Sequence, residues 1–118
     1  MKVYTGSRIL PGYQPTIHVS IEPSDPLGYI LDLNPSKMMV HDYDADCPEW
    51  GYFGSGPSQT AAAILYDLTE DPELSKKYHQ AFKREFIASY DQNGFKLLEI
   101  EIRLWLENML KSEGDYNE

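Results

Sequence analysis

The sequence has one cysteine, no long apolar run and few basic side chains, and each shortage excludes a class of protein. Cys47 has no second cysteine to pair with inside the chain, so no disulfide framework holds the fold. No apolar segment approaches the roughly 20 residues that cross a bilayer, and the N-terminus has neither the basic start nor the apolar core of a signal peptide. We therefore expect a cytoplasmic protein that needs neither a disulfide nor a metal for stability.

Basic residues are outnumbered: 10 Lys and Arg stand against 19 Asp and Glu, which gives a formal net charge of −9. Residues 1–75 contain 3 basic and 11 acidic side chains, whereas residues 76–118 contain 7 and 8. Nucleic-acid affinity depends on cations that replace the counterions of the phosphates, so this charge disfavours a nucleic-acid partner. We expect the partner to be another protein, and neither a nucleic acid nor a membrane.

The 118 residues are expected to form one domain, which can bury roughly two-thirds of its unfolded surface. Residues 16–22 alternate apolar with polar side chains, as a half-buried strand does. Further short strands are predicted at residues 2–5, 29–33 and 37–41. The predicted class is α+β: an antiparallel sheet of three or four short strands in residues 1–48, a glycine-rich connection at 49–57, three helices over 57–112 that cover one face of the sheet, and a frayed tail at 113–118.

Residues 49–59 divide the chain and read Glu-Trp-Gly-Tyr-Phe-Gly-Ser-Gly-Pro-Ser-Gln. Pro57 is predicted as the first helical residue, with Ser55 or Gly56 as the N-cap. The N–H groups of Ser58 and Gln59 would then point out of the helix N-terminus, which is the chemistry of an anion site. The motif is neither a Walker A loop, which ends in Gly-Lys-Ser/Thr, nor a complete dinucleotide fingerprint.

A ligand site is therefore one hypothesis for this block, with Trp50 or Tyr52 stacking on a base or ring. Its candidate ligand-binding residues are Trp50, Tyr52, Gly54, Ser55, Gly56, Ser58 and Gln59. The alternative is that Ser55 only caps the helix, while the glycines let the aromatic side chains fold back onto the core.

Three helices follow the block. The first is predicted over residues 57–68, since Ala61, Ile64, Leu65 and Leu68 share one helical face. The second starts with Asp71 as cap and Pro72 in the first position. Its predicted buried face is Leu74, Tyr78, Ala81, Phe82 and Phe86, and its predicted basic face is Lys76, Lys77, His79, Lys83 and Arg84. The third begins near Glu99 and carries enough apolar side chains to be the most buried of the three, with apolar width left over for a homodimer.

Residues 41–49 contain the side chains that suggest a metal: His41, Asp42, Asp44, Asp46, Cys47 and Glu49. An EF-hand loop that starts at Asp42 needs glycine at its sixth position and glutamate at its twelfth, where this chain has Cys47 and Phe53. We predict an acidic surface loop, with no catalytic residue, no bound metal and no cofactor. A metal-dependent hydrolase at this loop is kept as an alternative.

The block W-G-Y-F-G-S-G-P-S-Q-T-A-A-A-I-L, with V-Y-T-G-S-R before it and F-K-L-L-E-I-E-I-R-L-W-L after it, resembles a family of small uncharacterised proteins from bacteria and their phages, classed as a domain of unknown function. The most specific part is the pattern W-G-Y-x-G-S-G-P-x-Q. The chain departs from the family in having Leu98 where a Ser or Thr cap is expected, and in the proline-rich stretch from Pro11 to Pro35. The resemblance implies a cytoplasmic single-domain protein with no established activity.

Three functions are consistent with these patterns. The favoured one is a non-enzymatic protein-interaction module, which the resemblance extends to a phage or mobile-element accessory. The second is an anion or nucleotide binder at the helix start after Gly54, Ser55 and Gly56. The third is the metal-dependent hydrolase.

Overall fold

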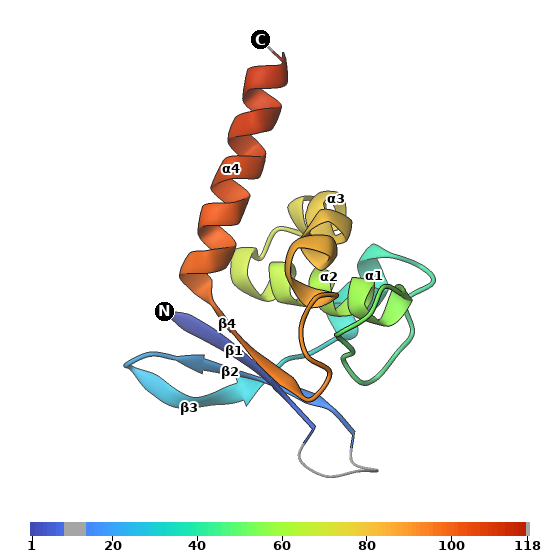
Figure 1. Cartoon of the computed structure of the whole chain (residues 1–118), viewed down its shortest axis with the longest axis vertical. Coiled ribbons are helices and arrows are strands. Elements are labelled where there is room, and N and C mark those ends of the chain that lie inside the picture. Colours follow the sequence, from blue (N-terminus) through green and yellow to red (C-terminus); the bar gives the residue numbers. More distant parts are fainter. Residues whose placement is uncertain (9–13, 118) are drawn as a thin grey trace.

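The computed structural model describes the backbone of residues 1–8 and 14–117, and their side chains as far as Glu113. The elements are β1 (Lys2–Ser7), β2 (Thr16–Ile21), β3 (Asp25–Ile30), α1 (Asn34–Met39), α2 (Ser55–Thr69), α3 (Pro72–Phe82), the π-helical turn η1 (Lys83–Ile87), β4 (Gly94–Leu98) and α4 (Glu99–Asn117). The helices lie on one side of a single sheet, and α4 extends away from it (Figure 1). The predicted α+β fold, an antiparallel sheet covered by helices, is confirmed.

The sheet has the strand order β3-β2-β1-β4, and every neighbouring pair is antiparallel. In its centre Tyr4 lies opposite Val19 on one side and Leu97 on the other, and all three side chains are fully buried. Successive side chains of a strand point to opposite faces, so Thr5 and Lys96 are exposed on the other face. The face that carries Tyr4 is therefore the one that packs against the helices.

The fourth strand comes from the C-terminal half of the chain, as β4. The prediction of a strand at residues 37–41 is wrong, since α1 occupies most of that segment. Pro35 stands in the first turn of α1, where a missing N–H leaves no helical hydrogen bond unmade. The edge beside β1 is taken by β4, whose Phe95 and Leu97 share one buried face.

The third strand lies further toward the N-terminus than the predicted residues 29–33. Asp25, Pro26 and Gly28 look like turn residues in sequence, but they belong to β3, an edge strand where proline is tolerated. The N–H of Gly28 donates to Oδ1 of Asp25 at 3.1 Å, and Gly28 has a φ of +53°. A side chain at Gly28 would also meet the Val19 carbonyl, so the irregular strand depends on glycine at this position.

α2 is the central helix and contacts α1, α3 and η1. The helix predicted over residues 57–68 is confirmed, and it extends slightly at both ends. Its buried residues are Pro57, Ser58, Gln59, Thr60, Ala61, Ala62, Ala63, Ile64, Leu65 and Leu68. The predicted cap is wrong: Gly54 is the N-cap, with extended backbone, and Ser55 is already helical and exposed.

α3 begins as predicted, with Asp71 accepting a hydrogen bond from the Leu74 N–H at 3.1 Å and Pro72 in the first turn. It passes without a break into η1. Within the predicted basic face, Lys76, Lys77 and Arg84 are exposed and Lys83 is half-buried. His79 does not belong to that face, since it is 5% exposed and turned inward.

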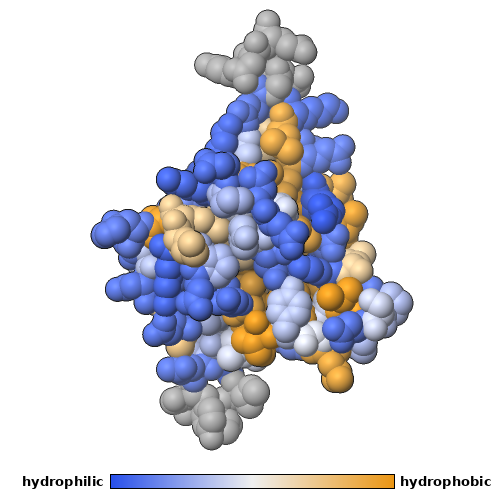
Figure 2. Space-filling view, turned by 180° about the vertical axis from the view of Figure 1, so that it is seen from behind, coloured by the Kyte–Doolittle hydropathy of each residue, from blue (hydrophilic) through white to orange (hydrophobic). Residues whose placement is uncertain are grey.

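α4 begins at Glu99, as predicted, and continues to Asn117, past the predicted start of the frayed tail; Glu118 lies outside the described residues. Ile102 and Leu106 are buried, and Trp105 packs on Phe82 with ring centroids 5.5 Å apart. Met109 packs partly against the core, and the other apolar side chains of α4 remain on the surface (Figure 2). Ile100, Leu104 and Leu110 are 46%, 55% and 48% exposed. The prediction that this helix is the most buried of the three is therefore wrong. In the described part of the chain, the helices are too short or too polar to cross a membrane.

Candidate functional site

The glycine-rich block places its aromatic side chains in two different environments. Trp50 is fully buried, its Nε1 donates to the Asp91 carbonyl at 3.1 Å, and its ring meets Phe95 edge-on at 5.1 Å. The guanidinium of Arg8 lies 4.4 Å from the centre of the Trp50 ring, so protein groups cover the indole. Tyr52, in contrast, is 41% exposed and lies against the first turn of α2, where its hydroxyl crowds Gly56.

The positive charge beside this block is already paired. Arg8 donates to Oε1 of Glu49 at 2.6 Å and to the Gln92 carbonyl at 2.5 Å. An anion that approached the start of α2 would have to compete with Glu49 for this guanidinium, because both are acceptors for the same donors. The arrangement ties the glycine-rich block to β1 and to the turn before β4.

Ser58 and Gln59 are each 2% exposed and turn into the protein. The prediction that the Ser58 N–H is free is wrong, since it donates to the Gly54 carbonyl at 3.2 Å. The reason is the early start of α2: Ser58 is the fourth helical residue, so its N–H has a partner inside the helix. The Gln59 side chain binds both backbone groups of Ala45, at 3.1 and 3.0 Å. The first-turn N–H groups of Ser55 and Gly56 remain for a ligand, and anion binding there stays a prediction.

The acidic loop at residues 41–49 does not gather its side chains for a metal. Asp46 pairs with Lys37 at 2.6 Å, and Asp42 contacts only its neighbour His41, at 3.2 Å, on the surface. Within residues 1–8 and 14–117, no three His, Cys, Asp or Glu side chains are grouped closely enough to bind a metal ion. A hydrolytic metal needs about three protein ligands, and the described side chains of this loop are not brought together in that number.

A chain of polar contacts, buried except at Gln80, holds the same loop to the helices. His79 donates from Nδ1 to the Lys76 carbonyl at 2.7 Å, which leaves Nε2 as the acceptor of the Tyr43 hydroxyl at 2.8 Å. Gln80 donates to the Tyr43 oxygen at 3.3 Å and lies 3.1 Å from the Ser58 hydroxyl. Burial lowers the pKa of His79, so the imidazole is neutral at neutral pH. With both ring nitrogens engaged, His79 is a structural residue.

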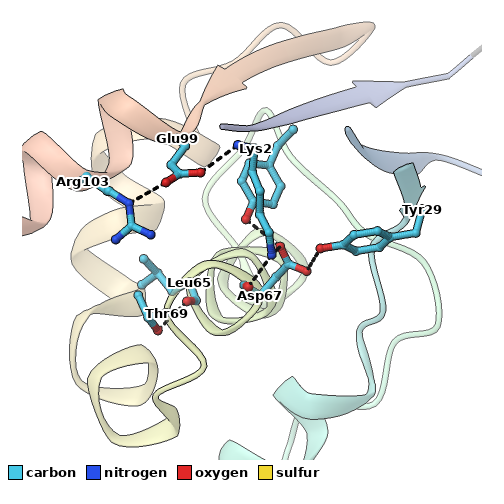
Figure 3. A network of polar contacts seen from close by, with 8 residues as sticks. Lys2, Tyr29, Leu65, Asp67, Thr69, Glu99 and Arg103 are labelled. Carbon is cyan, nitrogen blue, oxygen red and sulfur yellow. Dashed lines mark hydrogen bonds and ion pairs between the residues drawn. The ribbon is translucent and has the colours of Figure 1, made fainter. Parts of the chain in front are cut away.

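A second polar cluster joins the sheet to the end of α2 (Figure 3). The Asp67 carboxylate accepts from the hydroxyls of Tyr4 and Tyr29, each at 2.6 Å, and from Nζ of Lys2 at 3.1 Å. The backbone N–H of Lys2 donates to Glu99 at 2.7 Å, which brings α4 into the cluster. Burial, and then the bond to Asp67, raise the pKa of Tyr4, so its phenol remains a hydrogen-bond donor.

An open pocket of about 290 Å³ lies beside this cluster, and we call it the acidic pocket. Its lining residues are Lys2, Tyr29, Asp32, Pro35, Ala63, Tyr66, Asp67 and Glu70. Asp32 and Glu70 are exposed, and neither forms an ion pair with a described residue. Asp67 is neutralised by Lys2, so Asp32 and Glu70 give the pocket its negative charge.

A second depression, of about 350 Å³, adjoins the acidic pocket, and we call it the methionine groove. It is lined by Pro35, Met38, Met39, Tyr66, Pro72, Glu73 and Lys76, and it shares Pro35 and Tyr66 with the acidic pocket. Met38 is 90% exposed, although methionine is usually a buried residue. α1, the C-terminal part of α2 and the start of α3 therefore frame an apolar surface, with the charged side chains of Glu73 and Lys76 on α3.

These two depressions were not among the predicted site residues. Residues 37–41 looked like a strand, so the methionines were expected in a sheet and not on the rim of a groove. The signal that could have found the helix is Asn34-Pro35, since proline after a polar residue commonly starts one. Nothing in the sequence places Asp32 near Glu70, because their proximity depends on how α1 packs against α2.

The model of the Family of unknown function (DUF6166) matches residues 22–108, and the chain belongs to that family. The matched range contains the glycine-rich block, the methionine groove, the lining of the acidic pocket except Lys2, and most of the helices. It leaves out β1 and β2. No curated protein and no solved structure matches the chain.

Proposed function

We propose that this member of the family is a protein-interaction module that binds its partner at the methionine groove. The observation that carries the proposal is the groove itself: two methionines, two prolines and Tyr66 form an apolar depression, with Glu73 and Lys76 at its rim. Apolar surface rimmed by polar side chains is typical of a protein contact. Methionine suits such a surface because its flexible, polarizable side chain adapts to a partner.

The titratable groups support a binding role over a catalytic one. The raised pKa values of the Tyr4 and Tyr90 phenols move them away from ionisation, and the lowered pKa of His79 favours its neutral form. Burial raises the pKa of Tyr90, as it does that of Tyr4, while it lowers the pKa of His79. A general base must reach its substrate, whereas His79 is buried with both ring nitrogens hydrogen-bonded within the protein.

The test is a pull-down from cells that express the protein with an affinity tag. Wild-type chain is compared with Met38→Glu, and with Phe53→Glu as the matched control, since Phe53 is also an exposed apolar residue, at 72%, but precedes α2. We expect one partner at constant stoichiometry with the wild type and with Phe53→Glu, and its loss with Met38→Glu at an unchanged melting temperature. A partner retained equally by Met38→Glu would refute the groove as the contact surface.

A homodimer through α4 is a second interaction that the exposed helix supports. Ile100 and Leu104 are four residues apart and therefore share one face of the helix. Sedimentation equilibrium of wild type against Leu104→Lys tests it: we expect a dimer that the lysine dissociates. A wild-type monomer at every concentration would remove this proposal and leave the groove untouched.

A further inference from the structure

We infer that the partner segment is a peptide that places an apolar side chain in the methionine groove and a lysine or arginine in the acidic pocket. The inference rests on the proposed function and names the chemistry of the partner. Its basis is that the two depressions adjoin along Pro35 and Tyr66, so that one short segment of chain can enter both.

The charge of the acidic pocket selects a cation. The Lys2 ammonium is held by the carboxylate and the carbonyl of Asp67, at 3.1 and 2.9 Å, so these two charges satisfy each other. Asp32 is exposed and accepts the Asn34 N–H at 2.9 Å through Oδ1. Lys2 also lines this pocket but is paired with Asp67, so Asp32 and Glu70 present negative charge that no described residue pairs with.

The aromatic walls suit a side chain with an apolar stem. Tyr66 lines both depressions and Tyr29 lines the acidic pocket. A lysine or arginine lays its methylene groups along such rings while its charged end meets the carboxylates. A phosphate backbone or an anionic lipid surface would meet Asp32 and Glu70 as like charges, so a basic peptide is the partner that the surface favours.

The probe is a library of random dodecapeptides displayed on phage and selected on the immobilised full-length chain. We expect enriched peptides in which an apolar residue stands near a lysine or arginine. A synthetic peptide of the enriched sequence is then titrated against wild type, Met38→Glu and the double variant Asp32→Asn with Glu70→Gln. Asparagine keeps the Oδ1 acceptor for the Asn34 N–H, so this variant removes charge without removing that bond.

The expected result is a loss of about tenfold in affinity for the Asp32→Asn, Glu70→Gln variant, since two exposed ion pairs of modest strength are removed. The matched control is Asp42→Asn with Asp44→Asn, which changes the net charge equally at a different surface and is expected to bind as wild type. Replacing the peptide's basic residue with glutamine is expected to weaken wild-type binding by the same factor and to leave the double variant's binding unchanged.

The outcomes separate the two claims. The inference is overturned, and the proposed function supported, if Met38→Glu weakens peptide binding but the enriched peptides lack a basic residue. The same holds if Met38→Glu weakens binding but the Asp32→Asn, Glu70→Gln variant binds the peptide as tightly as wild type. Peptides that bind Met38→Glu as tightly as wild type, or a library from which nothing is enriched, overturn both. If the Asp32→Asn, Glu70→Gln variant and the Asp42→Asn, Asp44→Asn control lose peptide affinity equally, the attraction is long-range. That result also overturns the assignment of the basic side chain to the acidic pocket.

Discussion

α2 starts with Ser-Gly-Pro-Ser-Gln-Thr and three alanines, whereas α4 carries isoleucine, leucine and tryptophan along most of its length. Yet α2 is the helix that the rest of the protein surrounds, and α4 leaves Ile100, Leu104 and Leu110 on the surface. The small side chains of α2 let neighbouring elements approach it closely, and its polar side chains have partners inside. Burial in this protein therefore follows position in the fold more closely than side-chain hydrophobicity.

The polar side chains of α2 act on segments that have no regular structure of their own. Gln59 fixes Ala45, and the Thr60 hydroxyl accepts the Glu49 N–H at 2.9 Å. α4 instead makes its main buried contacts through Ile102, Leu106 and the ring of Trp105. α2 therefore contacts both the sheet and the loops, whereas α4 packs against the rest of the protein along one helical face. The following measurements test that difference.

The largest effect is expected from Ile64→Ala, because Ile64 is fully buried in α2 and its loss leaves a cavity. The free energy of unfolding should fall by about 2 to 5 kcal/mol. Urea denaturation followed by tryptophan fluorescence measures it. A loss below about 1 kcal/mol would mean that the centre of the molecule can collapse around the gap, and that α2 is less central than its burial indicates.

Gln59→Ala is expected to have the next largest effect. It removes the partners of both the Ala45 N–H and the Ala45 carbonyl, and should reduce the free energy of unfolding by about 1 to 3 kcal/mol. Gln92→Ala is the control, since the exposed Gln92 side chain donates one long hydrogen bond, of 3.4 Å, to the Gly51 carbonyl, while the bond from Arg8 goes to the Gln92 backbone and is kept. Hydrogen exchange should also speed up in residues 43–47 of the Gln59 variant. Equal stability of the two variants would contradict the role of Gln59 in holding the loop.

Acid should weaken the loop attachment through His79. Burial lowers its pKa below the ordinary value of 6.5, so between that value and the folded pKa the unfolded chain binds more protons than the folded one. Stability is therefore complete above the unfolded pKa and falls as the pH decreases through this window, by at most about 1.4 kcal/mol per pH unit for one proton.

The measurement compares urea unfolding of wild type and His79→Gln at about pH 7.5 and about pH 5.5, a range in which histidine titrates. Glutamine keeps an acceptor for the Tyr43 hydroxyl but does not titrate, so the variant should lose less stability on acidification. His41→Gln, at an exposed histidine, is the matched control for the substitution itself. An identical pH dependence in His79→Gln and wild type would show that His79 does not contribute.

The smallest effect is expected from Leu104→Ser on α4. Its side chain is 55% exposed, and the change in the free energy of unfolding of the monomer should stay within about 0.5 kcal/mol. The same denaturation experiment at low protein concentration measures it. A loss comparable to that of Ile64→Ala would show that this face of α4 is covered, and the contrast between the two helices would disappear.

Local signals along the chain predicted much of the fold. The alternation in residues 16–22, the Asp71-Pro72 start of α3 and the apolar face from Ala61 to Leu68 each depend on neighbours within a few residues, and each is found in the structure. The predicted strand at residues 37–41 fails for the same reason, because a short apolar run fits a strand or a helix equally well. The predicted ligand block was located correctly as a helix start, but its cap was misplaced, and Trp50 turned out to be covered by protein groups.

Local sequence patterns were enough to predict the class of the fold, the presence of a helix after the glycine-rich block and the starts of α3 and α4, since turn residues, caps and periodicity act over a few residues. The packing of whole elements sets which strand completes the sheet, which helix is central, and the placement of Asp32, Glu70 and the methionines of α1 on adjoining surfaces. The physical reason is that these relations join residues distant in sequence, and their energies depend on how whole elements pack against one another.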